Sequence, residues 1–405
     1  MFKFKINKSM IHGSVEPGFE EVKEEFINNF EKGEEVGAAF TAYYKGKKVV
    51  DLWGGYRDAK TKDPWKEDTL VLVFSTTKGI SGLACALAHS KGYFEYDEKV
   101  SKYWPKFAQN DKDNITVRQL LSHKAGLCAI DEPLDINKLG DPDKMKIAIE
   151  KQKPLWEPGK MHGYHGITLG WYESELIRKT DPQHRTIGQF FRDEIAKPLG
   201  LEIYIGLPDD VPDHRIANLY SPFYKFRMIF NTDKYPKPFV KAFMKKGTIT
   251  NRTFSNPKVL QTAKNYNTRE LRKIELPAAN GIVQVREVAK LYSIFASGGK
   301  ELNIKTETMN ALMEPAAVPD LGSLDQVLQI NLRYSLGFLK PSVDFHFGTD
   351  DKAFGTSGTG GSFGCADPAT QSSYCYAMNN LGFYIIADPR EKILADTFFK
   401  CIKNL

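Results

Sequence analysis

The sequence has few cysteines, no long apolar run, no dense basic tract and no internal repeat. Its cysteines are odd in number, widely spaced and without C-x-x-C spacing, so we expect reduced structural thiols, not disulfides or a zinc site. They are Cys85, Cys128, Cys365, Cys375 and Cys401. No apolar stretch approaches the roughly 18 residues that a membrane-spanning helix needs, so no transmembrane segment is expected.

The charge balance excludes further classes of protein. The 405 residues include 56 basic and 50 acidic side chains, for a net charge of +6, and the basic residues form no tract of the kind that binds nucleic acid. The sequence also has no spaced group of His, Asp and Cys side chains that would hold a metal. We therefore expect no nucleic-acid partner, no metal and no cofactor.

The first eight residues, Met1–Lys8, alternate lysine with apolar residues and lack the apolar core of a secretory signal. A cytoplasmic protein is therefore expected. No acidic residue precedes Glu16, which leaves a mitochondrial leader as an alternative, although the segment has no arginine.

The composition, 41% hydrophobic and 12% aromatic, provides for a large core, and the length favours two interleaved lobes. The spacing of apolar residues and the turn signals between them predict helices and strands along the whole chain. Helices are expected over 17–32, 75–91, 164–176, 187–195, 285–296 and 389–402, with short helical pieces over 97–103 and 116–121. Strands are expected over 36–44, 47–53, 334–339, 362–366, 371–378 and 382–387.

Residues 221–270 differ in character from the rest, because Phe and Tyr alternate with Lys and Arg. The pattern favours a solvated insertion that roofs a cleft. Contact with a membrane surface is the alternative.

Ser75 and Lys78, in Phe74-Ser75-Thr76-Thr77-Lys78-Gly79, are three residues apart, which places them on one face of a helix. A serine hydroxyl is a poor nucleophile until a base takes its proton. Lysine serves as that base only when neutral, so burial or a nearby positive charge must lower its pKa. The apolar residues before the motif and the small-residue run 80–88 after it predict such burial. A polar first turn of a buried helix would show the same pattern.

Two more polar clusters follow in order: Tyr164-His165, and Gly355–Gly361, whose sequence is GTSGTGG. His123, beside a glycine turn, is interpreted as a structural histidine and not as a catalytic base. With these clusters the chain resembles the serine β-lactamase and penicillin-binding transpeptidase superfamily, closest to the class C β-lactamases and their esterase relatives. The resemblance runs from about residue 36 to the end of the chain.

The resemblance implies an α+β fold of the β-lactamase/transpeptidase type, a mainly antiparallel sheet flanked by helices. Residues 1–93 and 277–405 would form the sheet lobe, and 94–276 an inserted helical lobe. It also implies catalytic roles for Ser75 as nucleophile, Lys78 as base and Tyr164 as proton shuttle, with the phenol pKa lowered by the neighbouring ammonium. The N–H groups of Ser75 and Thr359 would form the oxyanion hole. The implied substrate-binding residues are His165, Thr356, Ser357 and Gly358.

Two positions depart from that pattern. Thr356 takes the place of the K-T-G lysine, and Tyr164 is followed by His165-Gly166, without the Y-x-N asparagine. Both changes favour small ester or amide substrates over β-lactams, cleaved through an acyl-enzyme on Ser75. A catalytically weak binding or scaffold protein, and an acyltransferase, remain as alternatives.

Overall fold

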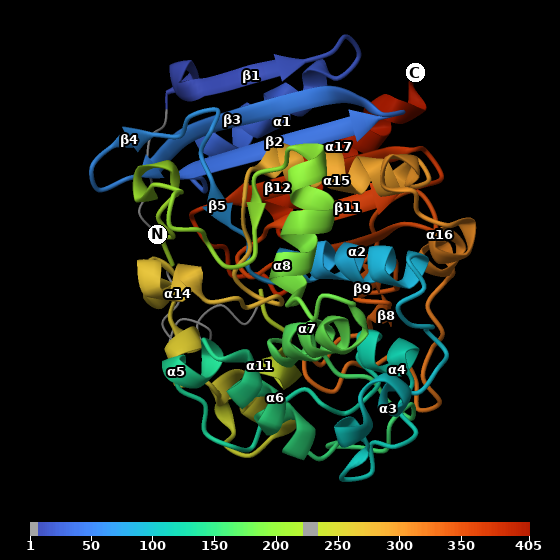
Figure 1. The fold of residues 1–405 in the computed structure, drawn as a ribbon. Coiled ribbons are helices and arrows are strands. Elements are labelled where there is room, and N and C mark those ends of the chain that lie inside the picture. Colours follow the sequence, from blue (N-terminus) through green and yellow to red (C-terminus); the bar gives the residue numbers. More distant parts are fainter. Residues whose placement is uncertain (1–6, 222–233) are drawn as a thin grey trace.

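The computed structural model describes residues 7–221 and 234–405. Nine strands within them form one antiparallel sheet in the order β1-β3-β2-β12-β11-β10-β9-β8, with β4 paired to β3. They are β1 Ile11–Val15, β2 Gly37–Tyr44, β3 Lys47–Asp58, β4 Asp63–Pro64, β8 Arg333–Ser335, β9 Phe338–Lys340, β10 Phe354–Ser357, β11 Phe363–Asp367 and β12 Ser372–Met378. N-terminal and C-terminal strands therefore lie side by side in this sheet (Figure 1).

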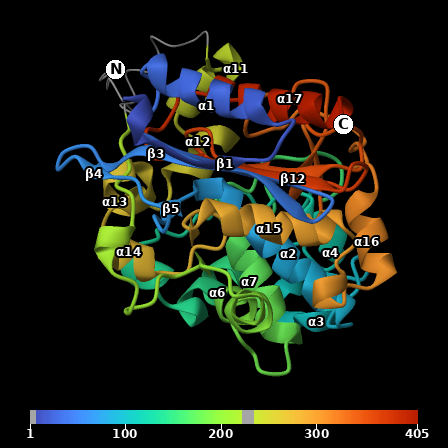
Figure 2. The ribbon, with the colours of Figure 1, turned by 90° about the horizontal axis from the view of Figure 1, so that it is seen from above.

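Helices cover both faces of the sheet. Figure 2 shows α1 (Glu20–Glu31) and α17 (Pro389–Lys403) on one face, and α15 (Val285–Ala296) and α2 (Thr77–Ser90) on the other. The aromatic residues of α1 point inward at helical spacing, and Phe19, just before the helix, stacks on Phe398 of α17 at 5.8 Å. This layering confirms the predicted fold class.

The remaining helices lie mostly below the sheet in Figure 1. They are α3 Val100–Tyr103, α4 Val117–Leu121, α5 Ile136–Leu139, α6 Pro142–Lys151, α7 Thr168–Thr180, α8 Ile187–Phe191, α9 Lys197–Leu199, α11 Lys237–Met244, α12 Ile249–Ser255, α13 Ala263–Tyr266, α14 Arg269–Lys273 and α16 Thr306–Met313. No helix of the described residues is both long enough and apolar enough to span a bilayer.

A second, three-stranded sheet joins distant parts of the chain. It consists of β5 (Val71–Leu72), β7 (Ile282–Val283) and β6 (Ile203–Tyr204), with β7 in the middle. Because β6 belongs to 94–276 and its partner β7 to 277–405, the sheet crosses the expected lobe boundary. The division into a sheet lobe and a helical lobe stays a prediction.

Several elements differ from those expected. Residues 334–339 form two strands, β8 and β9, because Leu336 and Gly337 take positive φ angles of 52° and 93° and reverse the chain. Residues 382–387 form no strand: the chain leaves the sheet after β12, and Gly382 N donates to Gly360 O at 2.8 Å. The first part of the basic and aromatic insertion, 222–233, and residues 1–6 lie outside the described residues.

Candidate active site

A strained turn presents Ser75 at the start of α2. Phe74 has a φ of +46°, a left-handed conformation that is costly for a bulky residue, and its ring packs on Tyr266 at 4.9 Å. Residues Phe74–Thr76 form a 3₁₀ turn, and α2 begins only at Thr77, two residues later than expected. Thr77 fixes the turn, since its hydroxyl donates to Phe74 O and accepts from Gly281 N at 2.8 Å.

The helix behind Ser75 is buried along its whole length. Its small residues let other elements approach: a Cβ on Gly79 would lie 1.9 Å from Tyr292 Oη and 2.5 Å from Thr356 Oγ1. Only a glycine fits at this crossing of α2, α15 and β10. The burial predicted for residues 80–88 is confirmed, and Gly79 before them allows close packing.

Lys78 lies within reach of Ser75 and is 1% exposed. Its Nζ is 3.2 Å from Ser75 Oγ, 2.5 Å from Gly166 O and 2.8 Å from Ala278 O. Burial lowers the pKa of Lys78 to about 7, while the Glu173 carboxylate acts in the opposite direction. The amine is therefore largely neutral above neutral pH.

Tyr164 reaches the same point from the loop before α7. Its phenol lies close enough to the Ser75 hydroxyl to be affected by it, and Lys78 Nζ lies over its ring, 4.7 Å from the centroid. Burial raises the pKa of Tyr164, and the neighbouring Ser75 hydroxyl only partly offsets this rise. The expected lowering of the phenol pKa by a neighbouring ammonium is wrong for this structure, because burial of the phenol is the largest influence and acts in the opposite direction.

The rings of the two histidines near Tyr164 form hydrogen bonds with backbone groups around it. His165 is buried, with Nε2 accepting from Leu127 N at 3.0 Å and Nδ1 lying 2.7 Å from Gly163 O. Its ring nitrogens are thus occupied, and it does not line the cavity at Ser75. His123 Nδ1 accepts from His165 N at 2.9 Å, and burial and neighbouring His165 lower its pKa well below the usual range. His123 thereby positions the Tyr164 loop, in agreement with its structural interpretation.

Strand β10 and the loop after it lie opposite Tyr164. The Thr356 hydroxyl accepts from Gly79 N and donates to Thr76 O, both at 3.1 Å, so it ties β10 to α2. Thr356, half-buried Ser357 and exposed Thr359 line the cavity, whereas Gly358 lies behind it, packed against Val73 O and Ser362 Oγ. Within the described part of the chain, the amide of Thr359 has no hydrogen-bond acceptor.

A family model described as Beta-lactamase matches residues 24–395. The chain belongs to the Beta-lactamase family. Esterase/beta-lactamase LipL of Mycobacterium tuberculosis is 27% identical over 381 residues, which cover 92% of this chain and 83% of LipL. This membership confirms the predicted resemblance and the prediction of a serine hydrolase.

Two solved structures resemble this Beta-lactamase family member over nearly its whole length. One is a family VIII carboxylesterase, with 34% identity and a TM-score of 0.84, covering 96% of this chain and 99% of that one. The other is a penicillin-binding protein homolog from Caulobacter crescentus, with 33% identity and a TM-score of 0.83, covering the same shares. They confirm the β-lactamase/transpeptidase-like fold.

The family member has a partly open, mainly apolar cavity of about 300 Å³ at Ser75. Lys78 is the one lysine, arginine, aspartate or glutamate among the described residues that line it. Those residues also include no group of three or more His, Cys, Asp or Glu side chains that could hold a metal ion.

Sequence reasoning missed several residues that support the site. Ser362 Oγ donates to Val73 O at 2.8 Å and lies 3.0 Å from Thr76 Oγ1, which fastens the loop after β10 to the Ser75 turn. Arg390 of α17 donates to Gly360 O, in the same loop, at 2.8 Å. Glu173 of α7 is fully buried and close enough to Lys78 to interact with its charge. No motif marks these residues, because each contributes through a contact with a distant part of the chain.

Proposed function

We propose that the chain is a serine hydrolase that cleaves small ester or amide substrates, esters above all, through an acyl-enzyme on Ser75. The observation that carries the proposal is the buried Lys78 amine, 3.2 Å from Ser75 Oγ and with a pKa lowered to about 7. A base with a pKa near the working pH is suited to take the serine proton.

The hydrogen bonds of Lys78 support this role. A neutral amine has two N–H donors and one lone pair. Gly166 O and Ala278 O lie at 2.5 and 2.8 Å and accept both N–H groups. The lone pair is left for the Ser75 hydroxyl, which donates its proton as Oγ attacks the substrate carbonyl carbon.

Tyr164 is assigned as the proton relay to the leaving group. Because its pKa is raised, its phenol stays protonated and acts as a donor, not as a phenolate base. It passes a proton to the departing alcohol and regains one from the Lys78 ammonium. Water then attacks the acyl carbon and gives its proton to Lys78, which passes that proton to Ser75 Oγ as the acyl–oxygen bond breaks and the acid leaves.

The amides of Ser75 and Thr359 are assigned to the oxyanion hole. Ser75 N lies in the first turn of a helix, where N–H groups have no intrahelical acceptor, and Thr359 N has no acceptor among the described residues. Both residues line the same cavity. Loss of one such donor typically costs about 3 kcal/mol of transition-state stabilisation.

Esters are preferred over β-lactams because Thr356 is neutral and its hydroxyl is engaged with α2. No cationic side chain other than Lys78 lines the described cavity to bind a β-lactam carboxylate. LipL and the carboxylesterase, both similar to this chain, carry esterase in their names. Thr356 and Ser357 are assigned to substrate contact, and His165 to support of the Tyr164 loop.

The test compares wild type with Ser75→Ala for labelling by a fluorophosphonate and for hydrolysis of p-nitrophenyl butyrate. We expect labelling and turnover in the wild type and neither in the variant. Labelling that survives in Ser75→Ala would remove Ser75 as nucleophile. Equal, background turnover of both proteins would instead favour a binding or scaffold protein.

A cytoplasmic protein, or a mitochondrial one, is also proposed, because all five cysteines are free and buried, as in a reducing compartment. The proposed partner is a small-molecule substrate.

The insertion 221–270 is proposed to roof the cleft. The described lysines of α11 face outward while its phenylalanines face the cavity, which supports a roof over the cleft in preference to a membrane contact.

A further inference from the structure

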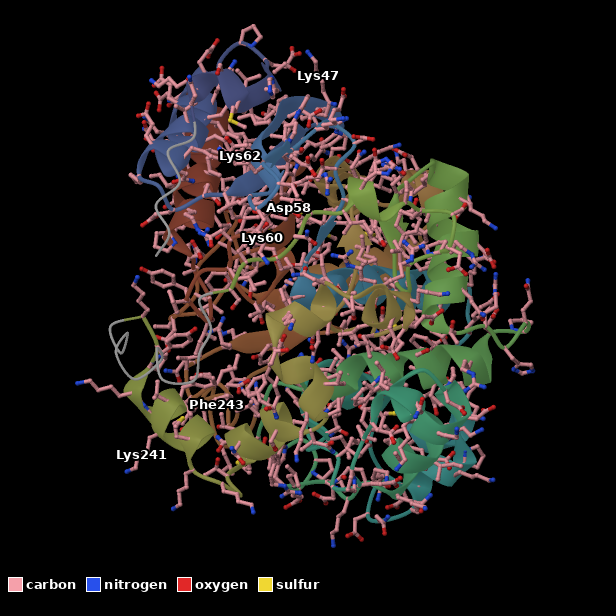
Figure 3. The ribbon with its side chains drawn as sticks, turned by 90° about the vertical axis from the view of Figure 1, so that its left-hand side faces the viewer. Lys47, Asp58, Lys60, Lys62, Lys241 and Phe243 are labelled. Atoms are coloured by element: carbon pink, nitrogen blue, oxygen red, sulfur yellow. The ribbon has the colours of Figure 1, made fainter. Side chains whose placement is uncertain are left out.

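Beyond Ser75, the cavity continues into a pocket with one predominantly aromatic side. This aromatic wall consists of Tyr235, Phe239 and Phe243 of the α11 segment and Phe254 of α12. Figure 3 shows Lys241 pointing away from the molecule and Phe243 lying on the inner side of the same helix. The amphipathic spacing of α11 thus turns its rings inward and its charges outward.

The rings of the aromatic wall pack on one another. Phe239 stacks on Phe243 at 5.8 Å and on Tyr235 at 6.2 Å, and Phe254 lies 6.2 Å from Phe239 and 6.0 Å from Phe243. Centroid distances of this size are typical of favourable aromatic pairs. The four rings therefore support one another and form one continuous apolar surface.

The aromatic wall begins beside the reacting groups. A Cβ placed on Gly166 would lie 3.3 Å from Phe254 and 3.6 Å from the Tyr164 ring, so both rings flank Gly166. The carbonyl of this same residue accepts from Lys78. A substrate with its carbonyl at Ser75 therefore extends directly onto the aromatic wall.

The aromatic wall also offers one polar atom. Tyr235 is 5% exposed, and its hydroxyl has no hydrogen-bond partner among the described residues. A buried hydroxyl left without a partner is unfavourable, and such a group commonly marks the place of a bound water or ligand.

We propose that the aromatic wall binds a bulky, uncharged, apolar group of the ester substrate that carries a hydrogen-bond acceptor for Tyr235. The proposal rests on the ester hydrolase function proposed above and names its substrate class. Each buried methylene is expected to raise kcat/KM about three- to fourfold until the pocket is filled. A charged group at the same place would lose its hydration without gaining a partner.

The experiment measures kcat/KM for p-nitrophenyl esters of two to eight acyl carbons and for acetates of alcohols from ethyl to octyl and benzyl. We expect a rise of at least about tenfold along one of the two series, and the series that rises identifies the half of the ester that meets the aromatic wall. An acyl chain ending in a carboxylate should lose that gain. Two flat series would overturn the proposal.

Substitutions in the aromatic wall test which residues produce the chain-length dependence of kcat/KM. Phe243→Ala should remove most of the chain-length gain, and Phe254→Trp, which narrows the pocket, should move the optimum to shorter chains. Val343→Ala, at a side chain 90% exposed, is the matched control and should behave as wild type. Tyr235→Phe should abolish any preference for a terminal methoxy over a terminal ethyl group. An unchanged preference in that folded variant would overturn the role of Tyr235.

Binding to Ser75→Ala separates this proposal from the proposed function. Calorimetry should show that the variant binds p-nitrophenyl octanoate more tightly than the acetate, whether or not the wild type turns over esters. Tighter binding without wild-type turnover would refute the hydrolase and leave the pocket proposal standing. Turnover of short esters without any chain-length effect on binding would refute the pocket proposal alone.

Discussion

Lys78 of α2 and Glu173 of α7 are both buried, and they influence each other electrostatically without a hydrogen bond between them. Neither carboxylate oxygen of Glu173 has a partner among the described residues, and a Cβ on Gly337 would lie 3.3 Å from one of them. Burial raises the pKa of Glu173 to about 8, and the Lys78 ammonium acts against that rise. The two groups therefore titrate as a pair around neutral pH.

The first prediction concerns the pH dependence of acylation. Lys78 accepts the Ser75 proton only when neutral, so kcat/KM should rise as pH increases through about 7. Stopped-flow labelling by a fluorophosphonate between pH 5 and 9 measures this directly. A rate that is flat across the range would contradict Lys78 as the base.

The second prediction concerns Glu173→Gln. In its ionised form Glu173 raises the pKa of Lys78, and since its own pKa is about 8 it is only partly ionised near pH 7, so its removal should move the rising limb of kcat/KM modestly to lower pH and leave KM nearly unchanged. Lys78 faces His123 and His165 as well, whose pKa values are lowered and which stay neutral in this range. The pH profile is compared with that of Glu275→Gln, a buried carboxyl that is not near Lys78. A profile that coincides with the wild type would show that Glu173 does not tune the base.

The third prediction concerns Tyr164→Phe. This change keeps the ring beneath Lys78 but removes the proton relay, so kcat should fall by about 10²-fold or more. Tyr172→Phe removes a buried hydroxyl that donates to Ile149 O at 3.3 Å and should lower only stability, by about 1 kcal/mol. Steady-state kinetics and urea denaturation distinguish the two variants, and equal kcat values would remove Tyr164 from the mechanism.

The fourth prediction concerns packing at Gly79. In Gly79→Ala the new methyl group would collide with Tyr292 and Thr356 and push α2 from β10, at a cost of about 1–3 kcal/mol and with loss of Ser75 labelling. Gly140→Ala is the control, since its nearest neighbour would be 3.6 Å away. Thermal melting of both variants checks the expectation. An unchanged Gly79→Ala protein would mean that the crossing is looser than described.

The fifth prediction concerns stability and pH at Glu391 of α17. Burial raises the pKa of Glu391 from 4.5 to about 8, so the folded state holds a proton that the unfolded state releases between these values. The free energy of unfolding should therefore fall as pH rises from about 4.5 to 8, by at most about 1.4 kcal/mol per pH unit from this group.

In wild type the Tyr374 hydroxyl donates to Glu391 at 2.7 Å. The glutamine of Glu391→Gln keeps an acceptor for this hydroxyl but cannot ionise. Urea denaturation at pH 5 and pH 8.5 should show a smaller loss of stability in this variant than in wild type. Buried Glu35 and Glu173 have pKa values raised in the same direction, so part of the loss should remain. Equal losses in both proteins would contradict the assignment to Glu391.

The sequence alone determined the spacing of Ser75 and Lys78, the buried run behind them, the closing helix α17 and the two strands over 36–44 and 47–53, which pair as a hairpin around Lys45-Gly46. These features depend on neighbours along the chain, whose geometry is set by helix and strand periodicity. The hairpin turn, for example, has positive φ at both Lys45 and Gly46. The family resemblance rested on such local motifs and was confirmed.

Only the tertiary structure decided the electrostatics and the pocket. Three features depend on elements far away in the sequence: the direction of the Tyr164 pKa shift, the electrostatic interaction of Lys78 with Glu173, and the aromatic wall. Thr356 and Gly79, which meet at 3.1 Å, are 277 positions apart. Burial changes the solvation of a charge more than any neighbouring residue type does, and a sequence motif carries no record of how deeply its side chains are buried.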